Sequence, residues 1–141
     1  MRFMMFMYPQ IPEEDWNPSA EDVAAMTRYN EELRKAGMLL ALDGLRPPSD
    51  GVSVVWEGRE AKVVDGPFTE AKEVVGGYWI IQARSTEEAL EWAKRCPGVD
   101  CRVEVRPIWE MEDFPPDLQE VYDSQLHIGV EDPAAPEAEA G

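Results

Sequence analysis

The residues best suited to chemistry lie between positions 64 and 79, where charged and aromatic side chains surround a short turn. Asp65 follows an apolar segment, and a carboxylate in such a place can act as a general base or anchor a ligand. Lys72 supplies an ammonium group for an anionic substrate or for negative charge that develops during a reaction. Tyr78 supplies a phenol that can donate a proton. These three side chains are the predicted catalytic set.

A structural interpretation of the same turn remains open. An Asp before a Gly-Pro pair accepts backbone N–H groups of the next residues, so Asp65 also suits a turn. Gly66 and Pro67 provide the backbone angles of a tight connection, and Phe68 would fill the core. Nothing in the spacing decides between a turn and a site.

Strand ends elsewhere in the chain supply further candidates for a ligand site. Asp43 precedes Gly44 at the end of a predicted strand, and it would approach Asp65 if the two strands were neighbours. Gly76 and Gly77 indicate either a bulge or a place where a ligand or a second backbone comes close. The predicted ligand contacts are Gly66, Pro67, Phe68, Gly76, Gly77, Asp43, Tyr8 and Arg106.

Size and charge limit the classes of function. The chain has 141 residues, 44% of them hydrophobic, and this composition favours one globular domain, here residues 1–110. Residues 111–141 form an acidic, Pro-rich extension with nine acidic residues and no Lys or Arg, which would serve as a solubilising tail or as an arm for a partner. The net charge of −16 repels phosphate backbones, so we expect no direct binding of nucleic acid. No apolar run approaches the length of about 20 residues that a membrane span needs, and we expect a cytoplasmic protein without membrane contact.

The two cysteines do not suggest a metal site. Cys96 and Cys101 are close in sequence, so a disulfide between them would close a very small loop and stabilise little. A zinc site would need more ligands, and the one histidine, His127, lies in the extension. We therefore expect two reduced thiols, no metal and no cofactor.

The pattern of apolar residues predicts alternating strands and helices. Strands are expected at 2–8, 38–42, 52–56, 61–64, 74–83 and 101–108, with a hairpin around 57–59. A capping box at Ser19 and Asp22 opens a helix that runs to about Ala36, and a second capping box at Ser85 and Glu88 opens another. The inward positions are expected to be Ala20, Val23, Ala24, Thr27 and Leu33 in the first helix, with Met26 on the flank, and Ala89, Leu90, Trp92 and Ala93 in the second.

This order predicts an α+β fold in which helices cover one face of a mainly antiparallel sheet. The other face would leave apolar side chains such as Trp56 and Tyr78 in water. Exposed apolar patches of that size usually mark interfaces. A homodimer that packs sheet on sheet would cover them and enclose a cavity at its seam.

The motif between residues 64 and 78 resembles that of the YCII-related proteins of the DGPF type. It reads Val-Asp-Gly-Pro-Phe-x-Glu-x-Lys-Glu-x-x-Gly-Gly-Tyr, and the resemblance extends over roughly residues 1–108. It implies a ferredoxin-like fold and a dimer related to the dimeric α/β barrels. Bacterial members are often encoded beside extracytoplasmic-function sigma factors, which implies a protein partner in transcription regulation. Some relatives carry a His–Asp pair that is proposed as catalytic, but this chain has no His before His127, so the pair is not carried over.

Three functions follow as hypotheses. The first is a dimeric small-molecule-binding protein that works as an accessory or sensor, in a sigma-factor system. The second is a proton-transfer enzyme of the isomerase or lyase type, with Asp65 as base, Lys72 as electrostatic stabiliser and Tyr78 as acid. The third is a structural or interaction protein that acts through its acidic extension.

Overall fold

The computed structural model describes residues 1–65 and 73–126, with side chains described as far as residue 121. The chain divides into two compact units, Met1–Ile108 and Trp109–Gly141, and each unit is described by itself. The predicted boundary at residue 110 stays a prediction.

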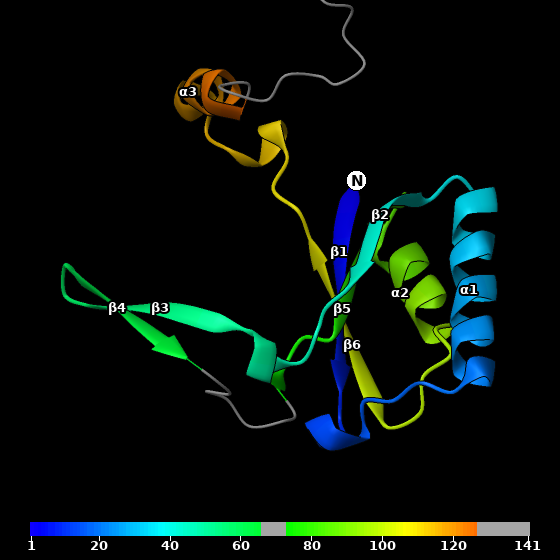
Figure 1. The fold of residues 1–141 in the computed structure, drawn as a ribbon. Coiled ribbons are helices and arrows are strands. Elements are labelled where there is room, and N and C mark those ends of the chain that lie inside the picture. Colours follow the sequence, from blue (N-terminus) through cyan, green and yellow to red (C-terminus); the bar gives the residue numbers. More distant parts are fainter. Residues whose placement is uncertain (66–72, 127–141) are drawn as a thin grey trace, which may run out of the picture. The chain divides into compact units, whose positions relative to one another are not determined.

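The centre of the first unit is a four-stranded antiparallel sheet with the strand order β2-β5-β1-β6 (Figure 1). The strands are β1 (Arg2–Pro9), β2 (Leu39–Gly44), β5 (Gly77–Gln82) and β6 (Cys101–Pro107). β1 pairs with β5 on one side and with β6 on the other, so Met5 lies opposite both Trp79 and Val105. The predicted α+β class and antiparallel sheet are confirmed, and the strand order is compatible with a ferredoxin-like fold.

Two helices pack on one side of this sheet, α1 (Ala20–Lys35) and α2 (Thr86–Lys94). α1 begins at the predicted capping box: the Ser19 hydroxyl accepts from the Asp22 N–H at 3.1 Å, and the Asp22 carboxylate accepts from the Ser19 N–H at 3.1 Å. The second capping box is only half formed. Ser85 accepts from the Glu88 N–H at 3.2 Å, but the Glu88 carboxylate accepts from the Arg84 N–H instead.

The core joins the helix side of the sheet to both helices. Its buried side chains are Phe3, Met5, Tyr29, Leu33, Met38, Trp79, Ile81, Ala83 and Ala89. Tyr29 and Trp79 meet edge to face with ring centroids 5.9 Å apart. The polar groups of both rings have hydrogen-bond partners. The Tyr29 hydroxyl donates to the Trp92 carbonyl at 2.8 Å, and the Trp79 indole N–H donates to Asn30 Oδ1 at 2.8 Å.

The predicted inward face of α1 is wrong at most positions. Leu33 is buried as expected, but Ala20, Val23, Ala24 and Thr27 are exposed. The packed stripe contains Met26, Tyr29 and Leu33, spaced by three and four residues as one helix face requires. In α2, Ala89 is buried and Trp92 and Ala93 pack on the core as expected, whereas Leu90 is 44% exposed.

The hairpin forms a separate two-stranded sheet of β3 (Val52–Glu57) and β4 (Glu60–Asp65). Its two-residue turn contains Gly58 at φ 63°, a conformation that glycine adopts without strain. The predicted hairpin is confirmed, while β5 is shorter than the predicted strand over residues 74–83 because it begins only at Gly77.

The second unit contains a short 3-10 turn, η4 (Met111–Asp113), and a helix, α3 (Pro116–Leu126). α3 is 11 residues long and carries Asp117 in its first turn. The rings of Trp109 and Phe114 stack with centroids 4.9 Å apart. None of the helices in the described residues is both long and apolar enough to span a bilayer.

Substitution of one leucine on each helix tests which faces of α1 and α2 pack on the sheet. Leu33→Ala should lower the free energy of unfolding by about 3–5 kcal/mol, since it removes a fully buried side chain and leaves a cavity. Leu90→Ala should cost less than about 1 kcal/mol, because this leucine lies at the surface. Urea denaturation followed by circular dichroism compares the two, and equal losses would contradict the assignment of the helix faces.

Candidate functional site

The side of the sheet that faces away from α1 and α2 is the candidate site, and we call it the open face. Successive side chains of a strand point to opposite faces, so the neighbours of the buried core residues point here. The pairing places Met4 opposite Ile80 and Phe6 opposite Tyr78. Together with Tyr8 these side chains remain partly exposed. The centre of the open face is therefore apolar and aromatic.

A hydrogen bond between Asp43 and Tyr78 borders the open face on the β2 side. The two residues are directly paired between β2 and β5, and the Tyr78 hydroxyl donates to Asp43 Oδ2 at 3.2 Å. This hydrogen bond and the nearby negative charge raise the pKa of Tyr78 above its ordinary value of 10.0. Tyr78 is thus a phenol that keeps its proton at neutral pH and can offer it to a ligand.

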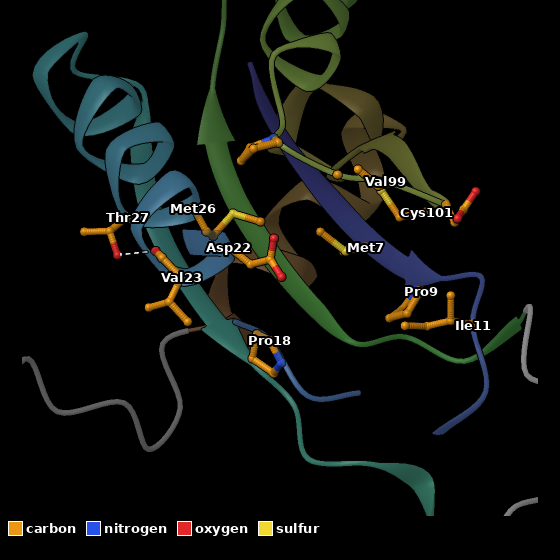
Figure 2. A pocket seen from close by; sticks show the side chains of 13 residues that line it. Met7, Pro9, Ile11, Pro18, Asp22, Val23, Met26, Thr27, Val99 and Cys101 are labelled. Atoms are coloured by element: carbon orange, nitrogen blue, oxygen red, sulfur yellow. Dashed lines mark hydrogen bonds between the residues drawn. The ribbon is translucent and has the colours of Figure 1, made fainter. Parts of the chain in front are cut away.

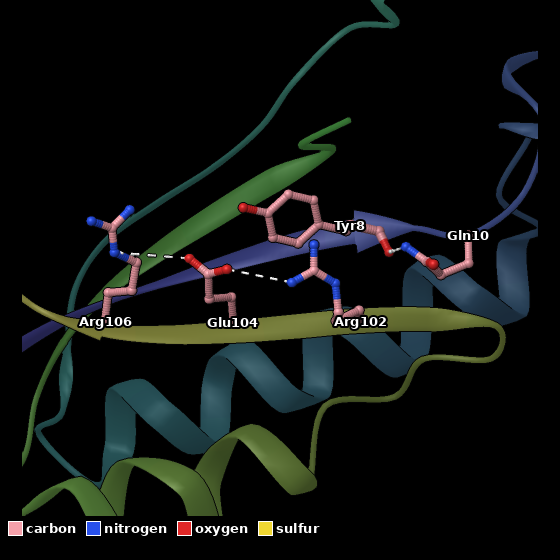
Figure 3. A network of polar contacts seen from close by, with 5 residues as sticks. All are labelled: Tyr8, Gln10, Arg102, Glu104 and Arg106. Atoms are coloured by element: carbon pink, nitrogen blue, oxygen red, sulfur yellow. Dashed lines mark hydrogen bonds and ion pairs between the residues drawn. The ribbon is translucent and has the colours of Figure 1, made fainter. Parts of the chain in front are cut away.

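Charged side chains of β6 border the open face on the opposite side (Figure 3). Glu104 lies between two arginines, at 3.3 Å from Arg102 Nη1 and 3.8 Å from Arg106 Nε. The Arg102 guanidinium also stacks over the Tyr8 ring, 4.0 Å from its centroid. Two cations against one carboxylate leave a local positive charge beside the aromatic centre, which suits an anionic group.

Several predicted site residues are brought to this face and others are not. Asp43, Tyr78, Tyr8 and Arg106 lie on it. Asp65 ends β4, exposed and opposite Val52, in the separate two-stranded sheet. Because β2 and β4 belong to different sheets, the strand pairing expected to bring Asp43 beside Asp65 is not formed. The remaining members of the motif lie outside the described residues: Gly66, Pro67, Phe68, Glu70 and Lys72.

The two motif glycines are surrounded by the protein's own chain. A Cβ on Gly76 would lie 2.7 Å from Cγ of Pro9, and a Cβ on Gly77 would lie 3.1 Å from the carbonyl oxygen of Asp43. The Gly76 N–H also donates to the Met7 carbonyl at 2.7 Å. The sequence allowed either a bulge at these glycines or the close approach of a ligand or a second backbone. The contacts with Pro9, Met7 and Asp43 agree with a close approach of the protein's own chain.

Arg102 and Glu104 were not among the predicted site residues. Their signal was present in the sequence, because residues 101–106 alternate between apolar and charged side chains. Such alternation predicts that all charges of β6 share one face. The pairing with β1 then places this face beside Tyr8 and Phe6.

The cysteines offer no reactive thiolate or metal site in the described part of the chain. Both are free and partly buried. Burial raises the pKa of the Cys96 thiol to about 12, and burial together with Asp100 raises the pKa of Cys101. Within the described residues, no group of three or more Cys, His, Asp or Glu is arranged to hold a metal ion.

A separate cleft lies on the helix side of the sheet (Figure 2). It has a volume of about 450 Å³, and its wall includes Met7, Val23, Met26 and Val99. The Asp22 carboxylate, which is part of the lining, already accepts the N–H of Ser19 in the capping box. This cleft is mostly apolar and shares no lining residue with the polar groups of the open face.

The contact of Gly76 can be tested by adding a methyl group. Gly76→Ala should lower the free energy of unfolding by about 1–3 kcal/mol, because the new Cβ overlaps the Pro9 ring. Gly44→Ala is the control, since a Cβ there meets nothing within 4 Å. Thermal and urea unfolding measure both variants, and a stable Gly76→Ala protein would contradict the packing of this strand end.

The Tyr78–Asp43 hydrogen bond can be tested by titration. Tyr78 should ionise above pH 10.0 in the wild type, and Asp43→Asn should lower its pKa because the nearby negative charge is removed. Asp100→Asn is the control, since it removes one carboxylate away from this pair and Asn tolerates the positive φ of 51° there. ¹³C-tyrosine NMR, with Tyr78→Phe for assignment, records the shift. An unchanged Tyr78 pKa in Asp43→Asn would exclude the interaction.

The chain was compared with known proteins. The model of the YCII-related domain matches residues 1–112. The protein "Uncharacterized protein R00369" of Rhizobium meliloti (strain 1021) is 31% identical over 99 residues, which cover 68% of this chain and 77% of that protein. The predicted family is thereby confirmed: the chain belongs to the YCII-related family.

Proposed function

We propose that this protein is a homodimer that binds a small molecule between the open faces of its two sheets. The observation that carries the proposal is the open face itself. It presents partly exposed apolar and aromatic side chains with hydrogen-bonding and charged groups at both borders. Ligand sites in proteins commonly combine an apolar wall with a few placed polar groups.

The charges of the open face favour an anionic ligand with an apolar or aromatic body. Arg102 and Arg106 would attract the anionic group, while Tyr78 would donate a hydrogen bond. Phe6 would contact the apolar body of the ligand. The role that fits this arrangement is that of an accessory or sensor protein in the cytoplasm, with a protein partner in a sigma-factor system as its setting.

The Asp43–Tyr78 pair supports a second candidate, a proton-transfer enzyme. Tyr78 would be the acid, with Asp65 as base and Lys72 as stabiliser of negative charge. This candidate requires Asp65 and Lys72 to lie beside Tyr78 in the substrate complex. Loss of any observed turnover in Asp65→Asn would favour it over simple binding.

Dimerisation through the open face can be tested with a charge placed at its centre. Ile80→Glu should raise the dissociation constant of the dimer at least about tenfold, because a carboxylate would be buried there without a partner. Leu90→Glu is the matched control on the exposed side of α2, and it should leave the dimer unchanged.

Native mass spectrometry and sedimentation velocity give the assembly state, and any discrete extra mass on the purified dimer identifies a bound ligand. A monomeric wild-type protein would refute the proposal. So would a dimer that Ile80→Glu leaves as stable as the wild type.

A further inference from the structure

The hairpin of β3 and β4 has one face made almost wholly of apolar side chains. Residues paired directly across an antiparallel ribbon point to the same side, so Val54 shares a face with Val63 and Trp56 shares it with Ala61. The same face includes Val52, which lies opposite Asp65 at the base of the hairpin. We call this surface the apolar face of the hairpin: Val52, Val54, Trp56, Ala61 and Val63.

These side chains lie in water in the single chain. The exposed fractions are 62% for Val52, 49% for Val54, 63% for Trp56 and 71% for Val63. Together they expose roughly 400 Å² of apolar surface, an area within the range that marks interaction sites on monomeric proteins.

The opposite face of the hairpin is the one suited to water. It carries Val55 opposite Lys62, Ser53 opposite Val64, and Glu57 opposite Glu60. Lys62 also forms an ion pair with Glu57 at 2.8 Å. The hairpin therefore has the alternation of a strand pair with one solvated and one buried face, although no second layer covers its apolar face in the described part of this chain.

The low stability of an isolated hairpin is a reason to expect that another surface packs on the apolar face of the hairpin. An isolated two-stranded hairpin is at best marginally stable in water, and it needs a third strand or a packed layer. β3 and β4 are hydrogen-bonded only to each other among the described strands. Packing against another surface would supply the missing layer.

A second copy of this chain fits that requirement in area. A stable interface buries about 800 Å² on each partner, and the apolar face of the hairpin offers roughly half of this. The open face of the sheet supplies further uncovered apolar surface on the same unit. In a twofold-symmetric dimer each chain contributes both surfaces, so the open face adds to the area that the hairpin buries.

Charge limits the surfaces through which a second copy can make contact. Each chain carries a net charge of −16, so two copies can approach closely only through surfaces without excess negative charge. From Val52 to Trp56 and from Ala61 to Val63 the apolar face of the hairpin carries no charged side chain, and its one acid, Asp65, lies at the base.

We infer that the β3–β4 hairpin is a dimerisation arm that packs its apolar face on a second copy of this chain, with Trp56 as the main anchor. The inference rests on the proposed dimer and adds a second contact to it. The arm also carries Asp65 at the end of β4, so docking of the arm fixes the strand from which the Asp-Gly-Pro-Phe motif departs.

A photo-crosslinker tests the arm directly. Trp56→p-benzoylphenylalanine keeps a large apolar side chain, and after irradiation it should give a covalent species of twice the chain mass. Val55→p-benzoylphenylalanine is the control, because Val55 lies next to Trp56 but on the opposite face of the hairpin. Mass spectrometry of the crosslinked peptides identifies the partner segment.

The same two positions test the energetic contribution. Trp56→Ser should raise the dissociation constant of the dimer at least about tenfold, as expected for loss of an aromatic anchor, whereas Val55→Ser should change it less than about threefold. Circular dichroism checks that the four-stranded sheet and its helices remain folded.

The outcomes distinguish failure of the proposed hairpin contact from failure of the proposed open-face dimer. A wild-type dimer that Ile80→Glu weakens, but that shows no crosslink at position 56 and no effect of Trp56→Ser, would overturn the arm and leave the open-face dimer intact. An intramolecular crosslink from position 56 to residues 109–141 would also overturn it, because the extension would then cover the hairpin. A monomeric wild type would refute both.

Discussion

Within the described residues, helices cover one face of the four-stranded sheet, and the rest of this structure depends on this constraint. Side chains alternate across each strand, so every residue that faces α1 and α2 has neighbours that face away from them. Phe3, Met5 and Ile81 are fully buried beneath the helices. Phe6 and Ile80 belong to the same strands, and no register of those strands would bring both sets under the helices. The open face is therefore a necessary product of the fold.

The electrostatics of the open face differ from those of the whole chain. The protein is strongly acidic, yet β6 presents Arg102 and Arg106 around the single carboxylate of Glu104. On the opposite border the Asp43 carboxylate is held by the Tyr78 hydroxyl. A negatively charged ligand would be repelled by most of the surface and attracted here, so the net charge of the chain contributes to the selectivity of this face.

The accuracy of the sequence predictions depended on how local each interaction is. The capping box at Ser19 and the hairpin around residues 57–59 involve residues within a few positions of each other, and both were predicted. The inward face of α1 was not, because Tyr29 is buried only where its hydroxyl reaches the carbonyl of Trp92, 63 residues away. A tyrosine and an asparagine on a helix carry no local sign that distant partners will satisfy them.

The same distinction applies to the candidate site. Asp43 was recognised from its place at a strand end and Tyr78 from its phenol within the motif, but their pairing depends on which strands become neighbours. We expected Asp43 to approach Asp65 if their strands were neighbours. Among the described strands, however, β4 pairs only with β3, so these two strands are not neighbours in a sheet. Short apolar strands do not reveal from sequence which sheet they join.

The Asp43–Tyr78 hydrogen bond suits both candidate functions, because a phenol that keeps its proton can donate a hydrogen bond to a ligand or a proton to a substrate. A phenol whose pKa is raised by a carboxylate is a persistent donor at neutral pH and a poor base. An anionic ligand that accepted from Tyr78 would compete with Asp43 for the same hydroxyl, and the arginines of β6 would offset the repulsion between the two negative charges. Binding of this kind needs only groups that already lie on the open face, whereas proton transfer by the proposed residues also needs Asp65, which ends β4 in the separate two-stranded sheet.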